Sequence, residues 1–392
     1  MPSALFAEAT SPRMPPSHPS HPSRLEHLVD EIRGYVSLHP AAELTVEGVM
    51  SWLVARAAQA TGEEVRHALS LMESRGELAG RRQPDPGAAQ RLRLGVDLGG
   101  SKIEIIAIDA SGATQLRKRV DTPHEDYEAI LGAIEGLVRD AERELSIPRN
   151  GASIGVGTPG SISRATGLLR GSNSVCLNGK RIREALEQRL GQSIAIANDA
   201  NCFALSEAVD GAGEDSAVVF GVILGTGVGG GIVVERKVLE GVNGIAGEWG
   251  HNPLPWPRDD ERPGAACFCG RHGCIETFLS GPGLARDHER ITGRREAARA
   301  IVAQAAAGDT ACESTLQRYE ERLARALAHV INIVDPDVIV LGGGLSNVDR
   351  LYANVPAQWG EWVFSDRVDT RFVKHLHGDS SGVRGAAWLV EG

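Results

Sequence analysis

Three cysteines and a histidine lie close together in the stretch 241–278. Cys267, Cys269 and Cys274 fall within eight residues, with glycines between them, and His251 precedes them across a proline-rich loop. Zinc prefers four sulfur or nitrogen ligands in a tetrahedron, and thiolates on a tight glycine-containing turn can converge on one ion without backbone strain. We therefore predict a closed, structural zinc site. The alternatives are three reduced thiols, or one disulfide with a spare cysteine.

Two acids flank the predicted metal ligands. Glu248 lies three residues before His251, and Glu276 lies two residues after Cys274. A bound zinc ion would fix both segments of the chain. The metal would therefore serve to aim these two carboxylates at another group.

A further carboxylate lies at the end of a predicted strand. The segment SIAIAND, residues 193–199, is typical of a strand that ends at Asn198 and Asp199. Polar residues at the carboxyl ends of strands in an open α/β sheet line the ligand crevice. We predict that Asp199 is a general base for a substrate hydroxyl. The alternative is that Asp199 caps the helix that follows.

Two glycine-rich turns each join a pair of predicted strands, LRLGVDLGGSKIEIIAIDASG at 92–112 and AVVFGVILGTGVGGGIVVER at 217–236. A strand after the glycines excludes the Walker loop and the dinucleotide fingerprint, because both need a helix there. One such turn alone is more often a plain hairpin. Two of them, about 125 residues apart, indicate duplicated lobes that offer backbone amides to one polyphosphate.

The remaining pattern is that of an α/β protein. Helical spacing at 127–145 leads to a strand at 152–160, and an amphipathic helix follows at 177–191. Later, an apolar helix at 323–334 precedes the strand VIVLGGG at 338–344. The glycines that end this strand are another place where a nucleotide could approach the backbone.

Composition limits the class of protein. The 392 residues are 42% hydrophobic, which is enough for a large core and two or three domains. The net charge of −10 argues against nonspecific binding to nucleic acid or to an anionic membrane. Three of the six cysteines, Cys176, Cys202 and Cys312, are scattered, which fits a reducing compartment. With no signal-peptide pattern and no long apolar run, we expect a soluble, cytoplasmic protein.

The chain before residue 92 has a different character. Residues 1–24 are rich in Pro, Ser and His and are expected to form a disordered tail. Residues 25–90 show helical spacing, with a capping box that begins at Thr61, and resemble a winged helix-turn-helix with its recognition helix at 62–74. Residues 1–92 hold nine Arg, no Lys and eleven acidic residues, so the expected DNA-binding charge is weak. The alternative is a small helical appendage used for packing or self-association.

Several motifs occur together in one order: DLGGSK, GTPG, NDAN, GTGVGGG, GEWGH and CFCGRHGC followed by IE. As a set they resemble the ROK family (repressors, open reading frames, kinases) of the actin-like ATPase and sugar kinase superfamily, over about residues 92–390. Within it, GEWGHNPLPW and CIETFLSG are most similar to bacterial manno(fructo)kinases. Ser101 stands where that family usually has threonine, which keeps the hydroxyl. The extension before residue 92 is absent from the short kinases and is similar to the DNA-binding domain of ROK repressors.

The resemblance implies a fold, a division of the chain and site residues. The fold would be the α/β, two-lobed actin-like ATPase (ribonuclease H-like) fold with an N-terminal helical extension. The small lobe would span 92–210, with a C-terminal helix 378–392 returning to it, and the large lobe 211–377, with a zinc-binding loop 251–274. The implied ATP-binding residues are Asp97, Gly99, Gly100, Ser101, Lys102, Gly225, Thr226, Gly227, Gly229 and Gly343. The implied sugar-binding residues are Asn198, Asp199, Glu248, His251 and Glu276, and the implied zinc ligands are His251, Cys267, Cys269 and Cys274.

These residues lead to a hypothesis about activity. We expect ATP-dependent phosphorylation of a hexose at its 6-hydroxyl, with fructose first and mannose or glucose next, and with Asp199 as the base. Mg²⁺ would bridge the phosphates near Asp97, and closure of the lobes would exclude water. The resemblance also suggests a homodimer and no membrane partner. The alternative is a sugar-responsive transcriptional repressor that binds DNA through residues 25–90.

Overall fold

The computed structural model describes residues 28–30, 32–33, 72, 92–123, 125–172 and 174–390. The chain divides into two compact units, residues 1–86 and 87–392. In the first unit the described residues are helical, and Leu28, Val29, Ile32 and Met72 are buried. The predicted tail, the capping box at Thr61 and the predicted recognition helix lie outside the described residues, apart from Met72.

The second unit begins with a five-stranded sheet of order β3-β2-β1-β4-β7. Its strands are β1 (Arg93–Leu98), β2 (Lys102–Ile108), β3 (Thr114–Asp121), β4 (Ser153–Thr158) and β7 (Ala195–Asn198). The first three form antiparallel hairpins, whereas β4 pairs in parallel with both β1 and β7. Two helices, α4 (Tyr127–Glu144) and α5 (Ile182–Leu190), supply apolar side chains to the core of this sheet. A short hairpin, β5 (Ser161–Ile162) and β6 (Leu169–Arg170), follows β4.

A second five-stranded sheet has the order β10-β9-β8-β11-β12. Its strands are β8 (Val218–Leu224), β9 (Val228–Val234), β10 (Lys237–Val238), β11 (Val338–Gly342) and β12 (Arg371–Lys374). Both sheets therefore have the same strand order: if the strands of each sheet are numbered along the chain, their order across the sheet is 3-2-1-4-5. In the second sheet, as in the first, the first three strands pair antiparallel and the other pairs are parallel. The shared topology agrees with the duplicated lobes that the two glycine-rich turns predict.

Helices cover the second sheet and its connections. They are α7 (Ile275–Leu279), α8 (Gly281–Thr292), α9 (Ala298–Ala306), α10 (Thr310–Val334), α11 (Leu351–Asn354) and α12 (Pro356–Trp359). Short 3-10 turns lie at η2 (Val175–Leu177), η3 (Trp249–His251), η4 (Asp259–Glu261), η5 (Gly344–Asn347) and η6 (Gly378–Ser380). The long helix α10 is amphipathic, and its apolar face forms much of the core of this lobe.

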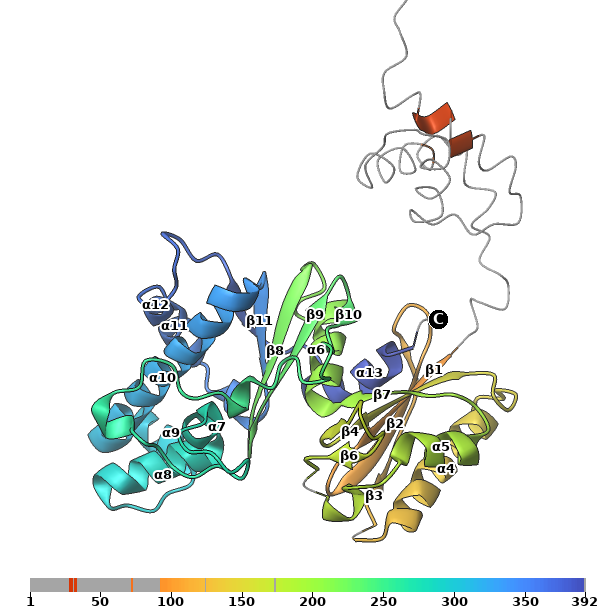
Figure 1. The fold of residues 1–392 in the computed structure, drawn as a ribbon, viewed down its shortest axis with the longest axis horizontal. Coiled ribbons are helices and arrows are strands. Elements are labelled where there is room, and N and C mark those ends of the chain that lie inside the picture. The colour runs from red at the N-terminus through yellow and green to blue at the C-terminus, as the bar shows by residue number, and fades with distance from the viewer. Residues whose placement is uncertain are drawn as a thin grey trace, which may run out of the picture. The chain divides into compact units, whose positions relative to one another are not determined.

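Two helices lie between the sheets, α6 (Asp199–Asp210) and α13 (Ser381–Trp388) (Figure 1). The backbones of the two helices are in direct contact, since a Cβ added at Gly385 would lie 1.6 Å from the carbonyl oxygen of Cys202. The C-terminal helix also packs directly on the first sheet, where a Cβ at Gly155 would lie 1.8 Å from the carbonyl oxygen of Ala386. Glycine is therefore needed at both contacts, and the last helix of the chain completes the first lobe.

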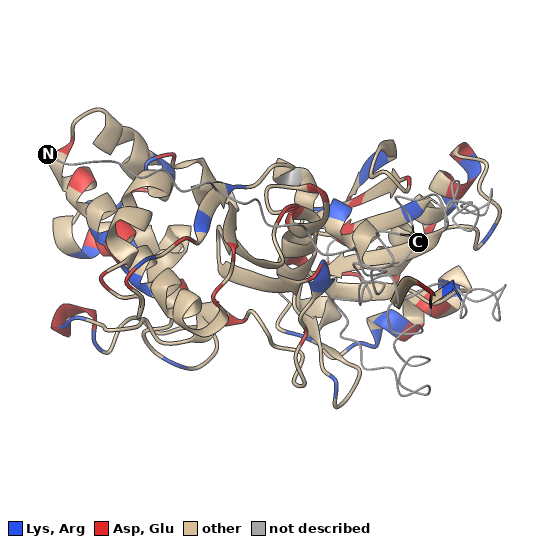
Figure 2. Ribbon diagram, turned by 90° about the horizontal axis from the view of Figure 1, so that it is seen from above, with Lys and Arg blue, Asp and Glu red and all other residues tan. Residues whose placement is uncertain are grey.

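Charged residues of both signs are spread over the helices and loops of the described residues (Figure 2). None of the helices in the described part of the chain is long and apolar enough to cross a bilayer.

Candidate active site

Asn198 and Asp199 lie where β7 ends and α6 begins. The Asn198 side-chain oxygen accepts a hydrogen bond from the amide of Asn201 at 2.8 Å, so Asn198 caps the helix. The alternative that Asp199 is the cap is wrong, because Asp199 is the first helical residue. Its carboxylate accepts from the amide of Ala200 at 2.8 Å. Part of the residue's surface is exposed at the end of the strand, but protein surrounds the carboxylate group itself.

Asp97, the fifth residue of β1, is partly buried and lies opposite Gly157 of β4. Burial, together with the negative charges of Asp199 and Glu104, raises the pKa of Asp97 to about 7. Burial, and then the charge of Glu248, also raises the pKa of Asp199. Asp199 thus lies within electrostatic reach of two other predicted site carboxylates, Asp97 and Glu248. Such a group favours a bound cation or a retained proton.

A cavity of about 310 Å³ lies beside Asn198 and Glu248. That volume is at the lower end of the range for small-molecule sites. Of the predicted sugar ligands, Asn198 and Glu248 line this cavity, whereas Asp199, His251 and Glu276 are not among its described lining residues.

The cavity also has wall residues that the sequence analysis did not single out, including Thr158, Asn201, Arg164 and Glu240. Asn201 could have been found, since it belongs to the same NDAN motif as Asn198. Arg164 follows β5 and Glu240 follows β10, and their side chains form an ion pair across the cavity wall. No local pattern signals this pair, because 76 residues separate its members.

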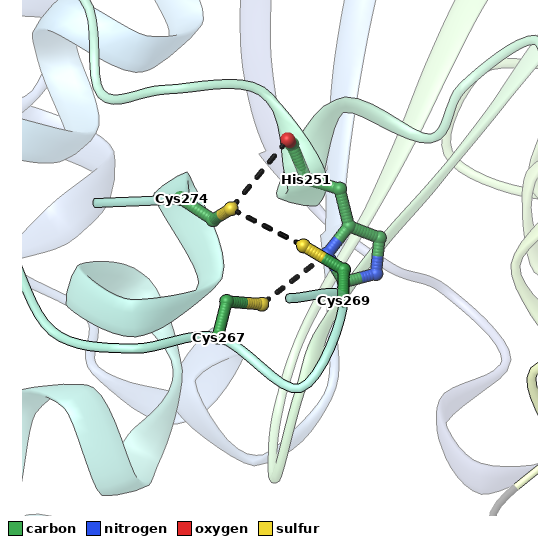
Figure 3. Close-up of side chains that lie close together, drawn as sticks. All are labelled: His251, Cys267, Cys269 and Cys274. Carbon is green, nitrogen blue, oxygen red and sulfur yellow. Dashed lines mark hydrogen bonds between the residues drawn. The ribbon is translucent and has the colours of Figure 1, made fainter. Parts of the chain in front are cut away.

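The four predicted zinc ligands converge in the structure (Figure 3). One ligand atom from each of His251, Cys267, Cys269 and Cys274 lies within 4.8 Å of all the others. Cys267 Sγ lies 3.5 Å from His251 Nδ1, and Cys269 Sγ lies 3.6 Å from Cys274 Sγ. Ligands on one tetrahedral zinc ion are separated by about 3.6–3.8 Å, so this donor set fits the ion. A disulfide needs sulfurs about 2 Å apart, and the three thiols are free.

A buried ion network supports the loop that carries these ligands. The Glu261 carboxylate, in η4, accepts from Arg322 Nε at 2.7 Å and from Arg325 Nη2 at 2.8 Å. Arg325 also donates to the backbone carbonyl oxygens of Pro255 and Trp256. Because Glu261 and both arginines are buried, this network ties the loop to α10.

The first glycine turn matches its predicted form. The Gly99 amide donates to the Lys102 carbonyl oxygen at 3.0 Å, and Thr122 Oγ1 donates to the Gly99 carbonyl oxygen at 2.8 Å. Gly100 and Ser101 are exposed at the tip. Their backbone is therefore accessible to a ligand.

The second glycine turn is open at its tip and closely packed within β9. A Cβ at Gly225 would meet nothing within 4 Å, and Thr226 is exposed. In contrast, a Cβ at Gly229 would lie 3.2 Å from Ala200 Cβ, and one at Gly231 would lie 2.7 Å from the Ala200 carbonyl oxygen. The glycines within β9 therefore let α6 approach the sheet. This packing against Ala200 favours glycine at position 229 whether or not the residue contacts phosphate.

Two other predicted residues also have neighbours that the sequence did not reveal. Gly343 has φ +79° and would place a Cβ 2.4 Å from the Leu224 carbonyl oxygen, so the turn after β11 requires glycine. The Glu276 carboxylate accepts a hydrogen bond from the amide of Val228 at 2.9 Å. It thus contacts the second glycine turn, rather than the cavity beside Asn198.

The family model described as "ROK family" matches residues 93–392, which is most of the chain. The chain belongs to the ROK family. It is 40% identical to an N-acetyl-D-glucosamine kinase of Vibrio atlanticus (strain LGP32) over 302 residues, 76% of this chain and 99% of the relative. The predicted resemblance to ROK sugar kinases is therefore confirmed. The particular likeness to manno(fructo)kinases is not.

Two solved ROK structures have the same fold. The ROK hexokinase from Thermus thermophilus is 29% identical, with a TM-score of 0.69 over 76% of this chain and 97% of its own. A ROK glucokinase from Streptomyces griseus, in complex with glucose and AMPPNP, is 26% identical, with a TM-score of 0.62 over 76% and 99%. The predicted actin-like ATPase fold is confirmed, and this ROK protein is a sugar kinase.

Proposed function

We propose that this ROK kinase transfers the γ-phosphoryl group of ATP to the 6-hydroxyl of N-acetyl-D-glucosamine. The observation that carries the choice of sugar is the 40% identity to a kinase named for that sugar, over 99% of the relative's length. Fructose, the first substrate expected from the sequence, is now an alternative substrate, together with glucose and mannose.

Asp199 is proposed to accept the proton of the reacting hydroxyl. It begins α6 next to a cavity lined by Asn198 and Glu248, and its pKa is raised chiefly by burial. A base whose pKa approaches the working pH takes a proton more effectively than an ordinary carboxylate. Because the Asn198 side-chain oxygen is occupied by the helix cap, its amide group is left to donate to a sugar oxygen.

The phosphates of ATP are proposed to lie against the tips of both glycine turns, at residues 99–102 and 225–227, with Gly343 and Gly344 nearby. The exposed backbone at Gly100 and the open space at Gly225 support this proposal. Mg²⁺ would be held on the side of Asp97 and would neutralise charge on the phosphates. Catalysis then depends mainly on positioning of the two substrates.

Zinc is proposed to hold the loop 251–274 rather than to take part in the reaction, since three sulfurs and one nitrogen complete its coordination. His251 uses Nδ1 on the side of the cysteines, so Nε2, on the far side of the ring, is proposed to donate to a sugar hydroxyl (Figure 3). The metal would thereby fix one sugar ligand directly.

The experiment is a measurement of ADP release with N-acetyl-D-glucosamine, N-acetyl-D-mannosamine, glucose, mannose and fructose, for the wild type and for Asp199→Asn. We expect the highest kcat/KM with N-acetyl-D-glucosamine and a loss of about 10³-fold in kcat for Asp199→Asn, because the variant lacks the base. Sugar affinity, measured by calorimetry, should change little. Ordinary turnover by Asp199→Asn would refute the role of the base, and a preference for fructose would refute the choice of sugar.

The rival function, a sugar-responsive repressor, depends on residues 25–90, most of which lie outside the described residues. It would displace the kinase proposal if no sugar of the panel gave turnover and the chain bound a specific DNA duplex. Such binding should weaken steeply as salt rises. The homodimer expected from the family remains a prediction, which a measurement of molar mass by light scattering would test.

A further inference from the structure

Glu276 joins two parts of the molecule that the sequence analysis treated separately. It lies two residues after the metal ligand Cys274, in the first turn of α7. One carboxylate oxygen, Oε1, lies 3.9 Å from Cys267 Sγ, on the side of the cysteine cluster. The other oxygen, Oε2, accepts a hydrogen bond from the amide of Val228 at 2.9 Å. Val228 is the first residue of β9, directly after the second glycine turn.

The glycine turn is shaped around this carboxylate. A Cβ at Gly227 would lie 2.8 Å from Glu276 Oε2, so any larger residue would displace the side chain. Gly225 and Gly227 also form the hydrogen bond that closes the turn, with the Gly225 amide donating to the Gly227 carbonyl oxygen at 3.0 Å. The contact with Glu276 therefore acts at the closed tip, next to the exposed Thr226.

Two further hydrogen bonds tie the same turn to the segments beside the metal ligands. Trp249 Nε1, two residues before His251, donates to the Gly229 carbonyl oxygen at 3.0 Å. The Gly281 amide, at the start of α8, donates to the Gly225 carbonyl oxygen at 2.8 Å. Among these contacts, only that of Glu276 uses a carboxylate. A charge-assisted hydrogen bond is roughly twice as strong as a neutral one.

We infer that Glu276 is a positioning residue for the nucleotide: it holds the turn 225–229 in the conformation that binds phosphate. Glycine-rich backbone loses much conformational freedom when it is ordered. A turn that is already fixed loses less freedom on binding, and the ligand binds more tightly. Nucleotide affinity therefore depends on Glu276 even when no sugar is present. The inference rests on the proposed function, in which this turn meets ATP, and it goes beyond the expectation that Glu276 only holds a sugar hydroxyl.

The test measures binding of the ATP analogue AMPPNP with Mg²⁺, in the absence of sugar, by isothermal titration calorimetry. Glu276→Gln keeps the shape and an amide oxygen that can accept, so we expect roughly fivefold weaker binding, and roughly 20-fold weaker binding for Glu276→Ala. The matched control is Glu248→Gln, the same change at the other acid beside the metal ligands, which lines the cavity. It should alter sugar affinity and leave the affinity for the analogue unchanged.

A second measurement does not depend on ATP. In Glu276→Ala, hydrogen exchange at the Val228 amide should be faster than in the wild type, whereas Glu248→Gln should leave it unchanged. The inference is overturned if both Glu276 variants bind the analogue as the wild type does and only their sugar affinity falls. Wild-type protein that binds neither analogue nor sugar would instead refute the proposed function, and unchanged exchange at Val228 would refute the positioning role alone.

Discussion

Asp97 gives the sharpest prediction about stability, because the fold raises its pKa from 3.8 to about 7. The main cause is burial, and the negative charge of Asp199 adds to it. In the folded protein Asp97 therefore keeps a proton that the unfolded chain loses. Its contribution to stability is fully present below about pH 4 and falls as pH rises, until it is lost above about pH 7.

The perturbation is Asp97→Asn, which keeps the shape and removes the ionisation. Between about pH 5 and pH 7 the wild type loses stability at about 1.36 kcal/mol per pH unit from this group, or about 2.7 kcal/mol over that interval. The asparagine does not titrate, so the variant does not lose this stability. Between about pH 5 and pH 7 the free energy of unfolding of Asp97→Asn, relative to the wild type, should therefore increase by up to that amount. The difference should be constant above about pH 8.

The assay is differential scanning calorimetry of the unliganded protein over a pH series. A gain of about 2.7 kcal/mol corresponds to roughly 5 °C in melting temperature for a domain of this size. The control is Asp121→Asn, the same change at an exposed acid at the end of β3. A difference between Asp97→Asn and wild type that is independent of pH would refute the reasoning. The variant should also lose kinase activity, since the proposed Mg²⁺ site loses its charge.

Two other predictions concern the loop that carries the cysteines. Glu261→Gln removes the carboxylate that the buried guanidinium groups of Arg322 and Arg325 share. Among the described residues, Arg322 then keeps only its ion pair with Asp287, and Arg325 only its pair with Glu321, so we expect a loss of about 3 kcal/mol in denaturant unfolding. The exposed pair of Glu184 with Arg181 is the control, and Glu184→Gln should change stability by less than about 1 kcal/mol. Removal of metal by a strong chelator should lower the melting temperature and weaken sugar binding, with recovery on addition of zinc. Sugar affinity that survives complete metal loss would contradict the proposed role of zinc.

Local patterns were sufficient to predict the hairpins and several of the helices. The apolar runs on either side of the two glycine turns predicted both hairpins, and helical spacing at 127–145 predicted α4, which ends one residue earlier than predicted. The group of four metal-ligating residues could also be predicted from the sequence, because three of them lie within eight residues of one another. These features depend on neighbours in the chain, which a sequence displays directly.

Other features depend on partners that are remote in the chain. Gly229 resembles a phosphate ligand in the sequence, but in the fold it lies against Ala200 of α6. Glu276 was predicted to face the sugar, and its hydrogen bond to Val228 depends on how α7 packs against β9. The pair of Arg164 and Glu240 joins loops of different lobes. Such contacts arise only when the sheets assemble, and no spacing rule describes them.

The return of α13 to the first sheet has a consequence for synthesis of the protein. Strands β1 and β4 are made early, yet the helix that packs against Gly95 and Gly155 ends at Trp388, near the end of the chain. The second sheet and α10 must therefore be synthesised before the first lobe can close. Until then one face of its sheet stays open to chaperones, and a chain cut short before Ser381 would keep that face uncovered.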